Sequence, residues 1–400
     1  MIVHRGAWVL PVAAPPIRNG WVAVEGGRIV ALGGPSDRAP QGEEPFSEPF
    51  SDPFVILPGL VNAHVHLELS WMRGAVPPAS SMPAWAAQLL SLRRANVGEP
   101  ADAMRVAIDD ARSFGTSLVG DVANTLESYH ALADSPMWAS VFFEQMGFRV
   151  PDPASHAAAA QSHMDALPQR ARMRAWVAPH APYSVSPGLL TAIGALGSRV
   201  VCIHLAESAE ELQFLRDGTG AWRTLLEALG VWDATWRAPD CGPVEYIARA
   251  GLLNERLVAV HGVQLADAEL SRLASANATL VTCPRSNVWT GAGAPPIERF
   301  YASGVRVAVG TDSLASVDDL NLFSELAAIR AAAPGIPAAK LLASATAHGA
   351  DALGFGAELG TIEPGKHAEL IAVRIPEAAG DVEEYLVHGV QPGDIRWLNG

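Results

Sequence analysis

Apolar, β-branched runs recur eight times between residues 60 and 312, and stretches of helical length rich in Ala, Leu, Arg and Glu separate them. The runs are LVNAHVH, TSLVGD, ASVFFE, RAWVAPH, VVCIHLAE, LVAVHG, ATLVTCP and VRVAVGTD. Strands that are apolar along their whole length are typical of parallel sheets with both faces covered. Eight such strands alternating with helices predict an α/β fold, a (β/α)8 barrel of the TIM type.

The two ends of the chain have a different pattern. They contain short alternating segments such as GWVAVEGGRIVAL and HAELIAVRI, broken by Gly and Pro. This alternation is typical of half-buried strands. We therefore expect residues 1–57 and 358–400 to form one small composite β-sandwich domain, beside a barrel domain over residues 58–357.

Residues that bind metals stand at the ends of several barrel strands. His64 and His66 are two positions apart at the end of the first strand, so both side chains leave the same face. His204 ends the fifth strand, and Asp312 follows the eighth. The carboxyl ends of barrel strands meet at one mouth. These four residues predict a metal site, with Zn2+ favoured and Fe2+ or Mn2+ as alternatives.

The scarcity of lysine favours one ion per chain. Lys340, in a helix after the eighth strand, and Lys366, in the terminal β segment, are the only lysines in the sequence, and neither lies at the mouth, where a carboxylated lysine would bridge two ions. Three imidazoles and one carboxylate leave a position for water on the ion, and the pKa of that water falls to about 7. The pattern therefore predicts a hydrolytic site.

Four more polar residues near strand ends are candidates for catalysis and substrate binding. Glu207 follows His204 closely and is placed to act as a general acid, although helix N-termini also favour glutamate for stability alone. His261 ends the sixth strand, where it can hydrogen-bond the attacking hydroxide or the tetrahedral oxygen. Glu144 and His180 end the third and fourth strands, where both can reach a substrate. For Glu144, a buried and paired carboxylate is the alternative interpretation.

The charge and the cysteine content limit the class of protein. A net charge of -14 leaves no basic stripe, which argues against nucleic acid or an anionic membrane as a partner and favours a small molecule. No apolar run is long enough to span a bilayer. Cys202, Cys241 and Cys283 are too few and too scattered for a disulfide framework, so we expect a cytoplasmic protein.

Taken together, these motifs resemble the amidohydrolase superfamily, and within it the aminohydrolase branch. The matching segments are PGLVNAHVHLELS, APHAPYSVSP, HLAES, VHGVQL, CPRSN, GTDSLASVDDLNLF and LGTIEPGKHAELIAV. The resemblance implies that one zinc ion is bound by His64, His66, His204 and Asp312. It also implies Glu207 as a proton shuttle and His261 as the partner of the attacking water. Asp312 would take the proton of that water and return it to the leaving ammonia.

The segments HLELS, FFEQMGF and PHAPYSVS look most like the aminodeoxyfutalosine deaminases of the menaquinone pathway. This resemblance implies hydrolytic removal of the 6-amino group from a 5′-modified adenosine-type nucleoside, with Glu144 and His180 as substrate contacts. Deamination of methylthioadenosine, S-adenosylhomocysteine or guanine stays open. So does hydrolysis of a cyclic amide, an imidazolone or a chlorotriazine. A non-catalytic binding protein is disfavoured because all four ligand positions are filled.

The sequence leaves several features of the protein open. The oligomeric state is undecided, with a homodimer among the options. Three arginines, Arg93, Arg94 and Arg149, follow the first and third strands and are candidates for binding a substrate anion, although solvated arginines are the commoner case.

Overall fold

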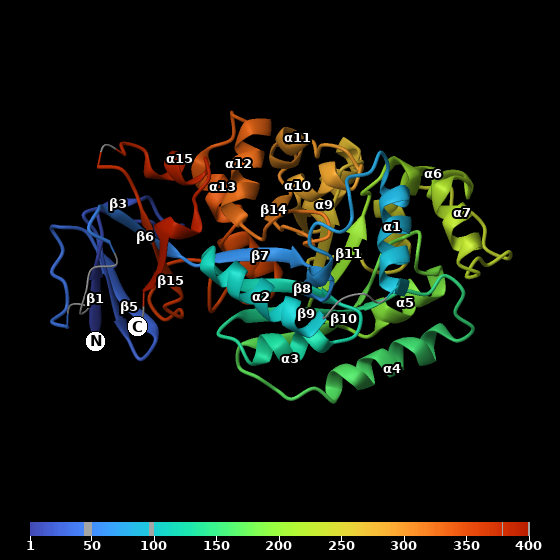
Figure 1. Ribbon diagram of the computed structural model, residues 1–400, viewed down its shortest axis with the longest axis horizontal. Helices are drawn as coiled ribbons and strands as arrows, with labels where there is room; N and C mark the ends of the chain where they lie inside the picture. Colours follow the sequence, from blue (N-terminus) through green and yellow to red (C-terminus); the bar gives the residue numbers. More distant parts are fainter. Residues whose placement is uncertain (44–49, 96–99, 378, 399–400) are drawn as a thin grey trace.

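The computed structural model describes residues 1–43, 50–95, 100–377 and 379–398, and two parallel sheets form its centre (Figure 1). The first sheet has the strand order β10-β9-β8-β7 and the second the order β11-β12-β13-β14. Their strands are β7 (Leu60–Val65), β8 (Thr116–Ala123), β9 (Trp138–Gln145), β10 (Met173–Pro179), β11 (Val201–Leu205), β12 (Leu257–His261), β13 (Thr279–Thr282) and β14 (Arg306–Val309). These are the eight apolar runs of the sequence, and the predicted α/β fold with parallel strands is confirmed.

The two parallel sheets meet at both of their outer edges. The N–H of His204 in β11 donates to the carbonyl of His180, which directly follows β10, at 2.9 Å. At the opposite edge, the N–H of Asp312, just after β14, donates to the carbonyl of His64 in β7 at 3.0 Å. The carboxyl ends of strands from both sheets therefore lie next to each other.

Helices follow most of these strands and lie around the outside of the sheets (Figure 1). Several begin with a side-chain cap; Asp152 and Ser186, for example, accept the N–H groups of Ser155 and Leu189. No helix in the described ranges is long and apolar enough to cross a membrane. The helices are α1 (Met82–Ala95), α2 (Pro100–Ser113), α3 (Glu127–Ala133), α4 (Pro153–Asp165), α5 (Pro187–Ala195), α6 (Ala209–Asp217), α7 (Ala221–Ala228), α8 (Pro243–Arg249), α9 (Asp267–Ser275), α10 (Pro284–Trp289), α11 (Ile297–Ala302), α12 (Leu322–Ala332), α13 (Ala338–Ser344), α14 (Ala347–Ala352) and α15 (Val382–Leu386), with 3-10 turns at Leu67–Met72 and Pro392–Asp394.

Strands from the two ends of the chain share one sheet, at the left of Figure 1. Its order is β16-β15-β6-β2-β3, formed by β2 (Trp8–Val9), β3 (Ile17–Arg18), β6 (Phe54–Pro58), β15 (Leu370–Arg374) and β16 (Ile395–Leu398). A second sheet contains β1 (Ile2–Arg5), β4 (Trp21–Glu25) and β5 (Arg28–Gly33). One apolar cluster joins the two sheets through Val22 and Ile29 on one side and Ile56 and Leu370 on the other. The exact domain boundaries stay a prediction.

Candidate active site

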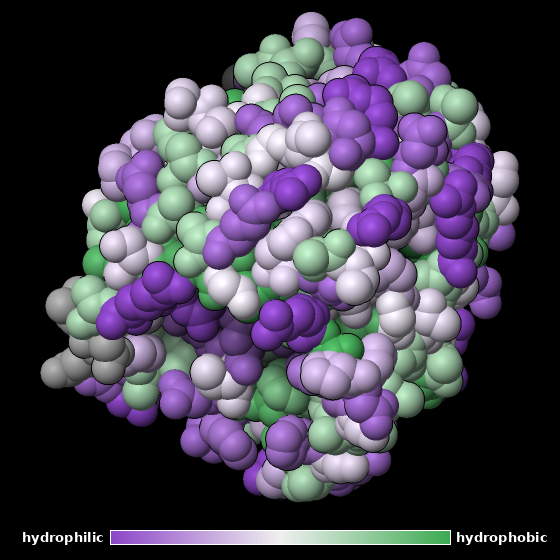
Figure 2. Space-filling view, turned by 90° about the vertical axis from the view of Figure 1, so that its right-hand side faces the viewer, coloured by the Kyte–Doolittle hydropathy of each residue, from purple (hydrophilic) through white to green (hydrophobic). Residues whose placement is uncertain are grey.

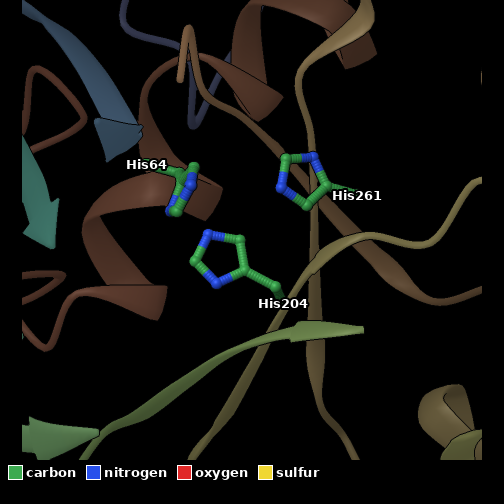
Figure 3. Close-up of side chains that lie close together, drawn as sticks. All are labelled: His64, His204 and His261. Atoms are coloured by element: carbon green, nitrogen blue, oxygen red, sulfur yellow. The ribbon is translucent and has the colours of Figure 1, made fainter. Parts of the chain in front are cut away.

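Three buried histidine rings point toward one another from three different strands (Figure 3). His64 comes from β7, His204 from β11 and His261 from β12. The ring centroids of His64 and His204 are 4.9 Å apart, and those of His204 and His261 are 5.3 Å apart. The strand ends therefore bring together residues that are nearly two hundred positions apart in the sequence.

Three distances between the predicted metal ligands suit one ion. The Nε2 atoms of His66 and His204 are 3.3 Å apart. The Oδ1 atom of Asp312 lies 3.5 Å from His66 Nε2 and 3.8 Å from His64 Nε2. Donor atoms about 2.1 Å from a tetrahedrally coordinated ion lie about 3.4 Å from one another. These three spacings therefore fit a single divalent ion.

The hydrogen bonding of His64 also fits a metal site. Neither of its ring nitrogens has a hydrogen-bond partner among the residues that the structure describes, although the ring is fully buried. Burial, followed by the neighbouring rings of His66 and His204, lowers the pKa of His64 well below 6.5. A neutral, buried and unpartnered imidazole is costly in a protein interior. It is also the form that binds metal, so the site fits a divalent cation.

Hydrogen bonds from outside the cluster orient two of the predicted ligands. The Nδ1–H of His204 donates to the carbonyl of His180 at 3.0 Å, which leaves Nε2 free to face the ion. Asp312 accepts from Ser286 Oγ at 2.6 Å and from the N–H of Ser313 at 2.8 Å. These bonds hold the donor atoms in place.

Left-handed backbone conformations occur at three positions of the mouth. Ala206, His261 and Asp312 have φ angles of 51°, 76° and 62°. A non-glycine residue in this conformation costs about 1–3 kcal/mol. Each of these residues ends or follows a barrel strand, where the turn redirects the chain at the mouth. Part of the backbone strain of the protein therefore lies at the mouth, beside the candidate site.

Glu207 and His261 form a second pair beside the predicted ligands. Glu207 Oε2 is 3.6 Å from His261 Nε2 and has no hydrogen-bond partner within the described ranges. Burial, assisted by Asp312 and Glu211, raises the pKa of Glu207 well above its ordinary 4.5, which favours the protonated acid. Asn287 Nδ2 lies 2.9 Å from His261 Nδ1, and donation there places the ring proton on Nε2. The pair therefore offers two proton donors.

Glu144 and His180 line the cavity that also contains His204, Glu207 and His261. Glu144 Oε1 is 3.5 Å from His204 Nδ1, and Glu144 Oε2 accepts from Asn124 Nδ2 at 2.8 Å. His180 Nδ1 is 2.5 Å from Ser184 Oγ, and burial lowers the pKa of His180 to about 3. Glu144 is thus both buried and paired, as the alternative interpretation proposed, and is still within reach of a ligand.

A cavity of about 190 Å³ opens onto this cluster. The polar residues described above that line it are His66, His180, His204, His261, Glu144, Glu207 and Asp312. Most of its other walls are apolar. These walls come from α1 and from α7 with the residues that follow it, and include Trp85, Leu89, Leu90, Leu225, Leu226 and Leu229. A larger cavity of about 810 Å³ lies beside Arg112 and Trp397, away from the cluster. The chemistry of the lining residues assigns the active site to the smaller cavity.

The predicted one-ion site is compatible with the positions of both lysines. Neither residue lines the cavity as the structure describes it. Lys366 Nζ donates to the carbonyl of Gly356 at 2.7 Å, and Lys340 lies in α13. Whether one ion binds stays a prediction.

The sequence analysis assigned no role to several residues that support the site. Asn124 follows β8, and Ser286 and Asn287 follow β13, so their positions just after barrel strands were a usable signal. Glu211 lies four residues after Glu207, and its carboxylate accepts the N–H groups of Ala206 and Glu207. The part that Trp85 plays in the cavity wall depends on how α1 packs.

Residues 55–390 match the model of the amidohydrolase family, which covers most of the chain and all eight strands of the parallel sheets. The chain belongs to this family. This amidohydrolase is accordingly a hydrolase that acts on C–N bonds, and the family implies a TIM-barrel-type α/β fold.

Relatives named as deaminases match most of this amidohydrolase. It is 27% identical to a 5-methylthioadenosine/S-adenosylhomocysteine deaminase from Desulforudis audaxviator, over 98% of this chain and 90% of that protein. It is 31% identical to an aminodeoxyfutalosine deaminase from Deinococcus radiodurans, over 84% of this chain and 81% of that protein. An adenosine deaminase structure from Xanthomonas campestris with bound zinc has a TM-score of 0.83 and 28% identity, covering 98% of this chain and 90% of that one. The zinc-bound neighbour and the donor set both support a divalent metal site.

Proposed function

We propose that this amidohydrolase is a metal-dependent hydrolytic deaminase that removes the 6-amino group of a 5′-modified adenosine-type nucleoside. The observation that carries this proposal is the convergence of His66, His204 and Asp312 with Glu207 and His261 in the lining of one cavity, with the buried ring of His64 beside them. The relatives named as deaminases of adenosine derivatives support the nucleoside class.

Four residues are proposed to hold the ion, namely His64, His66, His204 and Asp312. When bound, a divalent cation supplies Lewis-acid chemistry and makes water a nucleophile at neutral pH. The zinc in the related adenosine deaminase structure supports zinc as the native ion. We also propose that the eight strands close into one (β/α)8 barrel, which the hydrogen bonds at both sheet edges support.

The remaining residues are proposed to move protons and stabilise charge. Asp312 takes a proton from the attacking water and passes it to the amino group, which leaves as ammonia. Glu207 donates its proton to ring nitrogen N1 while C6 becomes tetrahedral, and it regains a proton from the C6 hydroxyl as ammonia leaves and the C6=O bond forms. The Nε2–H of His261 stabilises the negative charge that develops on the oxygen bonded to C6. These roles use the protonation states that burial favours at Glu207 and His261.

For the substrate itself, 6-aminodeoxyfutalosine is the proposed nucleoside, with Glu144 and His180 as its contacts. The relative from Deinococcus radiodurans supports this choice at 31% identity. Methylthioadenosine or S-adenosylhomocysteine is the second candidate, because a relative named as a deaminase of these nucleosides matches 98% of this chain.

An ammonia-release assay on the metal-analysed protein tests the proposal. The panel contains aminodeoxyfutalosine, methylthioadenosine, S-adenosylhomocysteine, adenosine and guanine. We expect ammonia from the 5′-modified adenosines and the highest kcat/KM for aminodeoxyfutalosine. A higher kcat/KM for methylthioadenosine would select the second candidate. No ammonia from any member, with the metal still bound, would overturn the purine substrate.

A further inference from the structure

The larger cavity of the protein, about 810 Å³ in volume, lies at the amino ends of barrel strands. Trp138 and Met173, which line it, are the first residues of β9 and β10, and Trp397 in β16 lines it from the terminal sheet. Figure 2 shows a different face, the one at the right of Figure 1 toward which β7 points, where hydrophilic and neutral residues predominate and hydrophobic residues show between them. Cavities that bind small ligands measure about 300–1,000 Å³, so the larger cavity has room for a ligand of its own.

Four arginines line this cavity, although the chain as a whole has a net charge of -14. Arg28 comes from β5 and Arg112 from α2, while Arg170 and Arg172 precede β10. Arg93 is the one arginine in the described lining of the active-site cavity. The fold therefore gathers positive charge from three distant segments at the larger cavity, where it attracts anions.

Two carboxylates belong to the described lining of the larger cavity, and each already has a cationic partner. Glu369 accepts from Arg112 Nη2 at 2.8 Å and from Trp138 Nε1 at 3.2 Å. Glu358 accepts from Arg174 Nη2 at 2.8 Å, and Arg174 does not line the cavity. These two ion pairs leave neither acid free to balance the other arginines.

The other three arginines of the lining have no carboxylate partner among the residues that the structure describes. Arg28 Nη1 donates to the carbonyl of Gly365 at 2.6 Å, and Arg172 Nη2 donates to the carbonyl of Ser135 at 3.3 Å. Both partners are neutral, and the side chain of Arg170 is exposed like those of Arg28 and Arg172. A guanidinium has five N–H donors, so each of the three has donors left for a ligand.

The positive charges around the cavity also act on one another. Burial lowers the pKa of Arg112, Glu369 opposes this shift, and the charge of Arg172 adds to the lowering. Burial and then the charge of Arg28 lower the pKa of His367, which lines the same cavity. A bound anion would relieve this repulsion between like charges.

We propose that the larger cavity is a second ligand site, which binds a small polyanion that carries several phosphate or carboxylate groups. Guanidinium forks match the oxygens of both groups, and three of them without an acid partner match a ligand with more than one negative charge. Arg28 belongs to a terminal sheet and Arg172 to the barrel, so the bound anion connects the two parts and stabilises the folded protein. The inference does not depend on the proposed deamination, because none of the candidate catalytic residues lines this cavity.

Calorimetric titration of the full chain with two polyanions tests this site. Benzene-1,3,5-tricarboxylate is the carboxylate probe and fructose 1,6-bisphosphate the phosphate probe, because the charged groups of each are too far apart to chelate one metal ion. Sodium chloride keeps the ionic strength constant, since salt screens exposed charges. The metal content and the melting temperature of the protein are measured with and without each probe.

Three variants locate the bound anion. Arg28→Ala and Arg172→Ala each remove one cation from a different side of the cavity, and both side chains are exposed, so we expect both variants to fold. Arg199→Ala is the matched control, because Arg199 is also exposed and also precedes a barrel strand, β11, but does not line the cavity.

We expect at least one probe to bind the unchanged protein and to raise its melting temperature with no loss of metal. Each cavity variant should weaken that binding by about 10- to 100-fold, the usual effect of losing hydrogen bonds to a charged group, and Arg199→Ala should leave it unchanged. Binding of one probe alone would support the site and select phosphate or carboxylate as its ligand group. No binding of either probe, or equal affinities in the unchanged protein and both cavity variants, would overturn the inference.

Discussion

The two ends of the active-site cavity are built from different kinds of structure. The inner end lies on strand ends, where side chains such as His64 and Asp312 are buried and Asp312 is held by Ser286. The outer end lies on two helices, and Leu229 there is only partly buried. Catalysis requires that the metal ligands and the hydrogen-bond donors are held in position before the substrate binds. Side chains that contact the rest of the substrate can vary without disturbing the catalytic residues.

The largest effect should come from the inner end, with Glu207→Gln. Loss of a positioned proton donor should lower kcat by about 10²- to 10⁴-fold. The ion should stay bound, because Glu207 is not among the proposed ligands. Ammonia release and metal content per chain measure the two effects. Glu210→Gln, in the first turn of α6 and outside the cavity lining, is the control. Near-normal turnover of Glu207→Gln would contradict the proposed role of Glu207 as a proton shuttle.

A smaller effect is expected at the outer end, with Leu229→Ala. Leu229 lines the apolar wall and is partly exposed, so its truncation should cost little stability. Weaker contact with the substrate should lower kcat/KM by about 10-fold through a higher KM, with kcat nearly unchanged. Steady-state kinetics on the preferred nucleoside measure both constants. A fall in kcat instead would show that the two ends do not act separately.

The smallest effect concerns stability and pH at the inner end. Burial raises the pKa of Glu211 to about 8, against its ordinary 4.5. Because the folded state holds this proton more tightly, the stabilisation is complete below pH 4.5 and is lost as the pH rises toward 8. The contribution of Glu211 to the melting temperature of the metal-free protein should therefore fall over this interval, and Glu211→Gln should remove that contribution.

Three other buried acids limit how flat the slope of melting temperature against pH becomes, and one of them is Glu207, whose pKa burial raises well above 4.5. Burial also raises the pKa values of Asp121 and Glu325 to about 7, so part of the pH dependence should persist in Glu211→Gln. Thermal melts of both proteins between pH 5 and 8, as a rough working range, measure the difference. Identical slopes would show that Glu211 does not hold its proton in the folded state.

The sequence by itself determined the parallel strands and the residues at their carboxyl ends. Apolar runs, the spacing of His64 and His66, and the position of Asp312 after the last run are local properties of the chain. The candidate site could be located from them because parallel barrel strands carry function at one end. Asn287 and Glu211 gave a weaker signal, since their bonds to His261 and to the N–H of Glu207 depend on loop conformations.

Only the tertiary structure decided which of the candidate arginines lies at the active-site cavity. Arg93 and Arg94 are adjacent and chemically identical, and the sequence pattern did not distinguish either of them from Arg149 as a candidate. The packing of α1 brings Arg93 to the cavity and leaves Arg94 exposed, and Arg149 is exposed as well. The rotation of a helix about its axis is set by contacts with distant segments, here α7, more than one hundred residues away. Such contacts leave no local pattern in the sequence.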